Sequence, residues 1–197
     1  MITGAKLILA SASPRRAEIL RTVGWPFETQ AVGIDESRRA GEEAVAYVER
    51  VARAKAEAAA LRAAGSTILG ADTVVVIANE VLGKPRDDED ARRMLRLLRD
   101  RWHQVLTGVA LVNGETDSSK VAHEVTEVRF AEMSEDEIGW YVATGEPQDK
   151  AGAYAIQGQG ARFIKEIRGD YFNVVGLPVR LIYELMNEGW AGARGGP

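Results

Sequence analysis

The chain has 197 residues, of which 46% are hydrophobic, and its 25 Lys and Arg against 29 Asp and Glu give a net charge of −4. This composition is typical of a globular protein with one domain or two small lobes, and its charge disfavours broad binding to nucleic acid or to an anionic membrane. Cysteine is absent, which excludes disulfides and thiolate chemistry, and no apolar stretch has the length of a membrane span. We therefore expect a soluble intracellular protein.

Strands and helices alternate in the first half of the sequence, a pattern typical of an α/β fold. Strands are expected over the apolar runs at residues 7–10, 27–32, 67–69 and 73–77. Helices are expected at residues 14–23 and 42–64, and Ser13 and Pro14 are residue types that favour the start of the first one. The segment Gly70-Ala71-Asp72 is expected to interrupt the two strands beside it.

The second half predicts two further helices, a strand pair and a hairpin before a last helix. The expected elements are helices at 88–99 and 134–144, paired strands at 103–112 and 121–130, a hairpin of 163–167 with 171–175, and a helix at 178–186. Parallel units early and hairpins late predict a mixed, twisted sheet with flanking helices. Residues 189–197 are predicted to be a flexible tail.

The segment at residues 11–16 concentrates groups that suit an anion. It brings two hydroxyl groups, the backbone N–H groups of a helix start and two guanidinium groups to one place. That combination favours a phosphate. The alternative is a capped helix with two solvated arginines, and these residues alone leave both interpretations open.

Two charged residues occupy positions where apolar residues are expected. Asp72 lies between apolar strand segments, where an unpaired carboxylate is costly, so it is either a catalytic candidate or the turning point of a tight bend. Lys55 continues the apolar stripe of its helix, which includes Val48 and Val51, so it either reaches back to solvent or points at a phosphate or carboxylate.

The chain lacks a P-loop and a dinucleotide fingerprint. A bound metal would be a hard ion held through oxygen, Mg²⁺ or Mn²⁺.

Six motifs occur in the order found in the Maf family of nucleoside triphosphate pyrophosphatases, which the chain resembles from residue 7 to about residue 186. They are Ser11-Ala12-Ser13-Pro14-Arg15-Arg16, Gly70-Ala71-Asp72-Thr73, Gly83-Lys84-Pro85, Asp149-Lys150-Ala151-Gly152-Ala153-Tyr154, Ile156-Gln157-Gly158 and Asn173-Val174-Val175-Gly176-Leu177-Pro178. The resemblance implies hydrolysis of a nucleoside triphosphate to the monophosphate and pyrophosphate with Mg²⁺ or Mn²⁺. It also implies a cytoplasmic homodimer and a single domain over residues 1–188, whose two lobes surround a deep cleft as in inosine triphosphatases.

The resemblance also implies roles for individual residues. Asp72 falls on the catalytic carboxylate, and the other charged active-site positions are Glu36, Lys55 and Lys84. Asp72 and Glu36 are the implied metal ligands. The positions of the phosphate-side loop are Ser11, Ser13 and Arg16. The positions that separate the subfamilies are Arg15, Thr73 and Gln157.

Arg, Thr and Gln at those three positions resemble the branch that acts on dTTP and UTP, whereas Trp, Gln and Glu are typical of the branch that acts on 7-methyl-GTP. Uracil and thymine present a carbonyl beside an N–H, which an amide such as that of Gln157 can match. Two alternatives remain: a 7-methyl-GTP pyrophosphatase, and a nucleotide-binding regulator of cell division without turnover. Modified pyrimidine triphosphates are further possible substrates.

Overall fold

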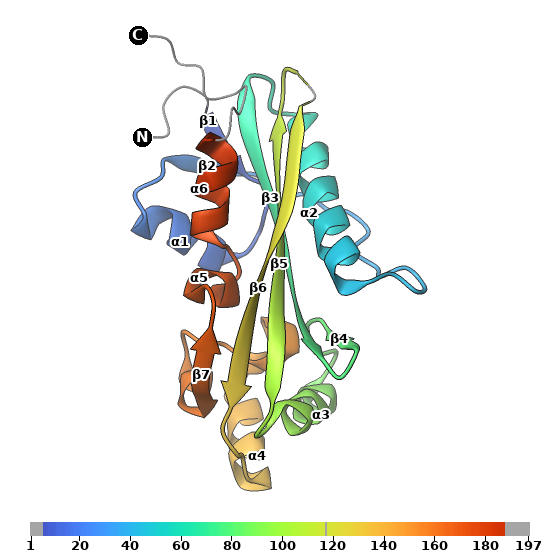
Figure 1. Cartoon of the computed structure of the whole chain (residues 1–197), viewed down its shortest axis with the longest axis vertical. Helices are drawn as coiled ribbons and strands as arrows, with labels where there is room; N and C mark the ends of the chain where they lie inside the picture. Colours follow the sequence, from blue (N-terminus) through green and yellow to red (C-terminus); the bar gives the residue numbers. More distant parts are fainter. Residues whose placement is uncertain (1–5, 117, 188–197) are drawn as a thin grey trace. The chain divides into compact units, whose positions relative to one another are not determined.

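A computed structural model of the chain describes residues 6–116 and 118–187, in which strands and helices alternate (Figure 1). The strands are β1 (Lys6–Leu9), β2 (Phe27–Thr29), β3 (Ser66–Ile77), β4 (Glu80–Leu82), β5 (Trp102–Asn113), β6 (Ser119–Phe130) and β7 (Ile164–Arg168). The α-helices are α1 (Pro14–Thr22), α2 (Ala44–Ala60), α3 (Asp88–Leu98), α4 (Glu135–Ala143), α5 (Tyr171–Val175) and α6 (Val179–Asn187). Short 3₁₀ helices are η1 (Glu146–Asp149), η2 (Ala151–Ala153) and η3 (Gln159–Phe163).

The strands form a mixed sheet in the order β2-β1-β3-β5-β6-β7, with β4 paired to β3 beside this path. β1 runs parallel to β2 and β3, and Ile8 pairs with both Glu28 and Ile68. β4 runs antiparallel to β3, and β7 runs antiparallel to β6. The predicted mixed α/β fold with flanking helices is therefore confirmed. Within the described ranges, no helix is both long enough and apolar enough to cross a membrane.

The chain divides into two compact units, and the predicted tail at 189–197 lies outside the described residues. The first unit comprises residues up to 72, 107–124 and from 176 onward, and the second comprises 73–106 and 125–175. β3, β5 and β6 each contribute residues to both units. The prediction of one domain over residues 1–188 stays a prediction.

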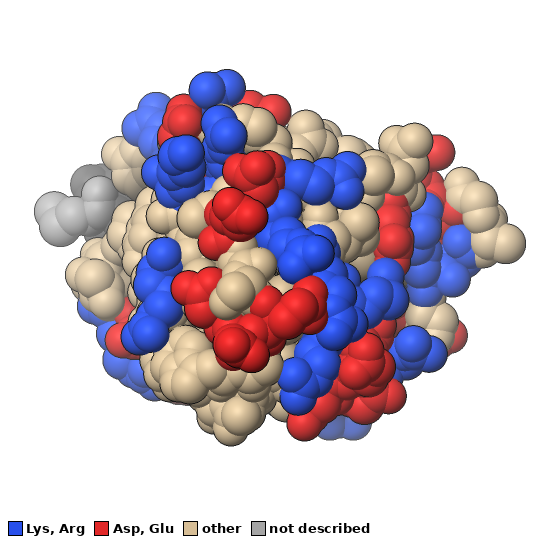
Figure 2. Space-filling model, turned by 90° about the horizontal axis from the view of Figure 1, so that it is seen from below, with Lys and Arg blue, Asp and Glu red and all other residues tan. Residues whose placement is uncertain are grey.

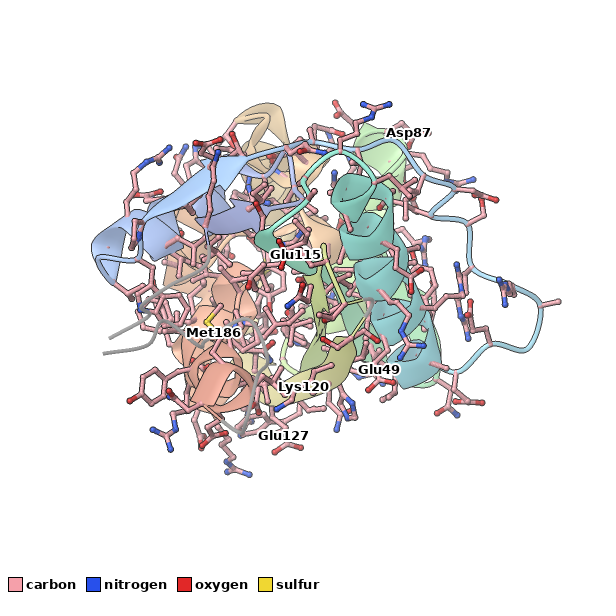
Figure 3. All side chains as sticks on the ribbon, turned by 90° about the horizontal axis from the view of Figure 1, so that it is seen from above. Glu49, Asp87, Glu115, Lys120, Glu127 and Met186 are labelled. Carbon is pink, nitrogen blue, oxygen red and sulfur yellow. The ribbon has the colours of Figure 1, made fainter. Side chains whose placement is uncertain are left out.

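The core of the first unit consists of small side chains where α2 packs on the sheet. Ala52, Ala56 and Ala59 of α2 are fully buried and pack in one cluster with Ile68 of β3. Gly70 permits this close packing, because a Cβ there would lie 2.1 Å from the backbone oxygen of Ala52. Figures 1 and 3 show α2, which carries the labelled Glu49, on one side of the strands and α6, which carries Met186, on the other.

The second unit has a separate core of larger aliphatic and aromatic side chains. α3, at the position of the helix expected over residues 88–99, buries Met94 and Leu95 on one face. His103, Phe130 and Tyr154 meet edge to face, with ring centroids 4.7 to 5.4 Å apart. A core of this kind fixes the register of the strands that carry these rings.

On the surface of the second unit, acidic and basic side chains form ion pairs. Glu135 at the start of α4 binds Arg96 and Arg99 of α3 at 3.0 and 2.9 Å. On the face seen in Figure 2, acidic and basic side chains lie intermixed. Ser134 caps α4 in a capping box with Glu137, at the residue where the sequence predicted this helix to begin.

Two predicted elements were wrong. The interruption of the strands at residues 70–72 is not present, because β3 runs without a break through Asp72. The second strand of the expected hairpin, at residues 171–175, is the helix α5. Its helical start depends on Asp170: the Asp170 side chain accepts the N–H of Phe172 at 2.7 Å, while the Asp170 backbone N–H donates to the distant Thr126 hydroxyl at 3.0 Å.

Candidate active site

A buried lysine joins two carboxylates in the first unit. The Nζ of Lys55 lies 2.8 Å from Oδ1 of Asp72 and 3.0 Å from Oε2 of Glu36. Lys55 and Asp72 are 8% and 7% exposed, whereas the Glu36 side chain is half exposed. Lys55 therefore does not reach back to solvent and Asp72 does not turn a bend, and the catalytic roles of both residues stay predictions.

The local sequence explains the contact of Lys55 with Asp72. Side chains two apart along a strand share a face, so Asp72 lies on the same face of β3 as Gly70, against which α2 packs. Lys55 follows Ala52 by three residues and thus lies on the same face of α2. Because glycine and alanine bring the two backbones together, the ammonium group reaches the carboxylate directly.

The loop that carries Glu36 is fastened to α2. The hydroxyl of Tyr47 donates to the backbone oxygen of Glu36 at 2.9 Å, and Nη2 of Arg50 donates to the backbone oxygen of Ser37 at 3.0 Å. Arg50 also binds Glu42 through two bonds of 2.6 and 2.9 Å. The bonds from Arg50 lower the pKa of Glu42 to about 2, so the Glu42 carboxyl that binds Arg50 is ionised at neutral pH.

Sequence reasoning missed Tyr47 and its partners. Tyr47, Val51 and Lys55 are spaced by four residues, which places them on one face of α2 and could have indicated that Tyr47 lies near the site. Burial raises the pKa of Tyr47 to about 12, with further contributions from the charges of Asp72 and Glu36. The phenol therefore stays protonated and donates its hydrogen bond over the physiological pH range.

Arg16 fixes the backbone next to Asp72. Its Nε donates to the backbone oxygen of Gly176 at 2.8 Å, and its Nη1 donates to the backbone oxygen of Ala71 at 2.8 Å and to Oγ of Ser11 at 3.2 Å. Burial lowers the pKa of Arg16 below its ordinary value, and the nearby charge of Asp72 opposes this effect. Arg16 therefore connects three segments of the first unit at the end of β1.

The predicted phosphate-side loop forms a turn at the start of α1. The backbone N–H of Ser13 donates to Oγ of Ser11 at 3.2 Å. Ser13 and Pro14 take the predicted N-cap and first helical positions, but the side chain of Ser13 makes no capping hydrogen bond. Arg15 is half-buried in the first turn. Phosphate binding by these residues stays a prediction.

The remaining predicted residues lie in the second unit. Lys84 is exposed in the loop after β4, and Gln157 is exposed between η2 and η3. Thr73 follows Asp72 in β3 and is half-buried. Their roles in catalysis or base recognition stay predictions.

Two of the predicted site residues suit a hard cation. Asp72 and Glu36 bind the same ammonium group, so oxygens of both carboxylates reach one positively charged atom. Mg²⁺ is commonly held by one or two carboxylates together with water and substrate phosphates. In residues 6–116 and 118–187 no group of three or more His, Cys, Asp or Glu forms a metal site, so a cation bound at this pair would take its other ligands from phosphate and water. The donor set fits such a cation.

A surface hollow of about 580 Å³ also lies in the first unit, lined by Arg21, Trp25, Pro26, Phe27, Glu28 and Thr29. It shares no residue with the cluster of Asp72, Lys55 and Glu36 and has no comparable pairing of a buried lysine with carboxylates. The chemistry therefore points to the cluster rather than to the hollow.

The chain matches the family described as Maf-like protein over residues 6–189 and belongs to that family. It is 53% identical over 183 residues to the dTTP/UTP pyrophosphatase of Symbiobacterium thermophilum, and the aligned residues make up 93% of each chain. It is 51% identical over 182 residues to the dTTP/UTP pyrophosphatase of Salmonella typhimurium, which covers 92% of this chain and 91% of that relative. Its fold is similar to that of the Staphylococcus aureus Ham1 protein, with a TM-score of 0.52 at 15% identity over 92% of this chain and 97% of the other.

Proposed function

We propose that this chain hydrolyses dTTP and UTP to the nucleoside monophosphate and pyrophosphate. The observation that carries the proposal is the buried contact of Lys55 with Asp72 and Glu36, at 2.8 and 3.0 Å. It occurs in a chain that is about half identical, over more than nine-tenths of its length, to relatives named dTTP/UTP pyrophosphatase.

Asp72 is the group we assign to the proton transfer. Water attacks the α-phosphorus, the bond from that phosphorus to the oxygen bridging the β-phosphate breaks, and pyrophosphate leaves. Asp72 accepts the proton of the attacking water, because it is the buried carboxylate of the cluster and Lys55 holds one of its oxygens in place. Positioning and electrostatics are expected to supply most of the rate, as in other phosphoryl chemistry.

The charges of the cluster explain why a cation is part of the proposal. Asp72 and Glu36 are balanced by Lys55 and the buried Arg16, so the cluster offers no surplus positive charge to a triphosphate. We assign the additional positive charge to Mg²⁺ or Mn²⁺ held by the two carboxylates, and to Lys84 and Arg15. When bound, the metal ion neutralises charge that develops on the leaving pyrophosphate.

Base preference is assigned to Gln157, with Arg15 and Thr73 as further residues that match the dTTP and UTP branch. The Gln157 amide is exposed, and its carbonyl and NH₂ groups can pair with the N–H and carbonyl of uracil or thymine. These residue types differ from those typical of the 7-methyl-GTP branch. We also propose, from the family resemblance, a cytoplasmic homodimer, and sedimentation at assay concentration tests the dimer.

A nucleotide panel tests the proposed function. Pyrophosphate release is measured from dTTP, UTP, CTP, GTP and 7-methyl-GTP with Mg²⁺, with Mn²⁺ and with a chelator. We expect the highest kcat/KM with dTTP and UTP and no turnover with the chelator. A preference for GTP or 7-methyl-GTP would refute the assignment of base preference. Tight binding of nucleotides without pyrophosphate release would refute the enzyme and favour the regulator.

A further inference from the structure

One carboxylate in the second unit holds the segment that carries Gln157. Oε1 of Glu146 accepts the hydroxyl of Tyr141 at 2.7 Å and the backbone N–H of Gly160 at 3.0 Å. Oε2 of Glu146 accepts the backbone N–H of Gln159 at 2.8 Å. The Tyr141 oxygen accepts in turn the backbone N–H of Ala155 at 3.1 Å. The carboxylate and the hydroxyl thus bind both ends of residues 155–160.

The glycines of this segment make the attachment possible. A Cβ at Gly158 would lie 2.3 Å from Oε2 of Glu146. A Cβ at Gly160 would lie 2.5 Å from the Tyr141 oxygen and 2.8 Å from the backbone oxygen of Ala155. Any larger residue would displace the anchoring side chains, so the glycines on either side of Gln159 are explained by contact with Glu146 and Tyr141.

The anchor is charged at neutral pH. Burial of Glu146 disfavours its ionised form, but the N–H groups of Gln159 and Gly160 and the hydroxyl of Tyr141 outweigh this effect and lower its pKa. Burial raises the pKa of Tyr141, with a further contribution from its bond to Glu146, so the phenol remains a donor. Hydrogen bonds to a charged acceptor are stronger than neutral ones, so the segment is held firmly.

We propose that Glu146, assisted by Tyr141, is the positioning residue that orients Gln157 and thereby sets base selectivity. The proposal rests on the proposed function, in which Gln157 contacts the base. Gln157 is exposed, and the backbone of residues 155–160 sets the position from which its side chain extends and the region that its amide can reach. An amide that is already oriented loses less conformational entropy on binding the base than one on a loose loop. Glu146 itself touches no substrate in this scheme.

Glu146→Gln is the primary variant. In either orientation of the amide, its NH₂ group would face one backbone N–H donor, that of Gln159 or that of Gly160, so at least one of the three bonds is lost. We expect KM for UTP to rise about tenfold and the kcat/KM ratio of UTP over GTP to fall about tenfold, which is the effect of losing one hydrogen bond to a charged group. The value of kcat should stay within about threefold, since the phosphate chemistry is assigned to other residues.

A double-variant cycle separates positioning from general damage. Gln157→Ala should reduce the selectivity ratio by a similar factor, and the variant with both changes should be no worse than Gln157→Ala alone, because Glu146 acts through Gln157. Tyr141→Phe keeps the ring and removes the hydroxyl, so it tests the anchor even if Glu146→Gln folds poorly. Glu166→Gln is the matched control, since Glu166 makes an exposed ion pair with Arg168 at 2.9 Å in the same unit. It should leave the ratio unchanged.

Hydrogen exchange provides a readout that does not depend on activity. The amides of Gln159 and Gly160 should exchange faster in Glu146→Gln than in the wild type. Unchanged exchange, an unchanged selectivity ratio, or losses that multiply in the double variant would each overturn the inference. If the wild type releases no pyrophosphate from UTP, the proposed function fails and the selectivity claim fails with it, while the exchange result still decides whether Glu146 anchors the segment.

Discussion

Asp72→Asn separates the chemistry of the site from its stability. The substitution keeps the size and shape of the side chain and removes its charge, so it removes the proton acceptor while keeping an oxygen toward Lys55. We expect turnover to fall by at least about a hundredfold, the low end of the effect of a general base. Nucleotide should still bind, because Lys84 and Arg15 are unchanged, although the metal ion loses one of its two proposed carboxylate ligands.

The effect on folding should be small in comparison. Lys55 keeps its contact with Glu36 at 3.0 Å, and its 2.8 Å bond to residue 72 changes from an ion pair to a hydrogen bond between the ammonium group and a neutral amide oxygen. That change corresponds to about 1 kcal/mol in the free energy of unfolding. Loss of activity in Asp72→Asn therefore would not be explained by unfolding at assay temperature.

The assay combines three measurements: pyrophosphate release from dTTP, nucleotide binding by calorimetry, and urea unfolding. Asp90→Asn is the matched control, because Asp90 is also a buried carboxylate, 6% exposed, and binds Nε of Arg93 at 2.9 Å and Nε of Arg86 at 3.2 Å in the second unit. We expect it to lose about 1 to 3 kcal/mol of stability and to keep its kcat. Near-normal turnover in Asp72→Asn would remove Asp72 from its role, and an equal loss of kcat in both variants would mean that turnover reports stability alone.

Three further predictions concern stability. Lys55→Met removes the cation from two carboxylates and should lower the free energy of unfolding by about 3 kcal/mol in a urea titration. Lys6→Met is the control: it breaks the exposed ion pair of Lys6 with Glu28 and should lower the free energy of unfolding by less than about 1 kcal/mol. Equal losses in the two variants would argue against a buried cluster. Gly70→Ala places a Cβ 2.1 Å from the backbone oxygen of Ala52 and should lower the free energy of unfolding by about 3 kcal/mol. Thermal melting measures this loss, and a melting temperature equal to that of the wild type would contradict the packing of α2 on β3. Burial lowers the pKa of His103 to about 3, so below about pH 6.5 the unfolded chain binds a proton at this histidine that the folded chain does not bind. The stabilising effect of the neutral histidine is therefore fully present above that pH, and the free energy of unfolding should fall by about 2 kcal/mol from about pH 7 to about pH 5. His103→Asn should remove this fall.

The sequence predicted those features that depend on one segment at a time. The helices expected at 88–99 and 134–144 and the start of α1 at Ser13 and Pro14 follow from local patterns and are present in the structure as α3, α4 and α1. The charged residues Asp72 and Lys55 were visible because each breaks an apolar pattern. Their contact with each other depends on how closely α2 packs on β3, which required the position of Gly70 relative to Ala52 in three dimensions.

The features that local patterns did not predict depend on contacts between distant segments. Residues 171–175 have the composition of a strand, yet Asp170, held by Thr126, begins a helix there. Tyr47 and Arg50 hold the loop of Glu36 through its backbone oxygens. Because every residue has a backbone oxygen, the sequence does not indicate which of them accepts such a bond. Arg16 was predicted as a phosphate ligand from its place in a motif, whereas its Nε and Nη1 bonds to Gly176 and Ala71 are visible only in the fold.

Both units use a glycine to bring a charged side chain into a position it could not otherwise occupy. Gly70 lets α2 approach β3 until Lys55 reaches Asp72, and Gly158 lets Glu146 reach the backbone of the Gln157 segment. The added methyl of alanine would collide with the backbone of α2 at Gly70 and with the Glu146 carboxylate at Gly158. Gly158→Ala should therefore reproduce the loss of base selectivity of Glu146→Gln, although it changes neither Glu146 nor Gln157. If Gly158→Ala folds normally and keeps the wild-type selectivity, close packing of Glu146 does not determine the orientation of Gln157.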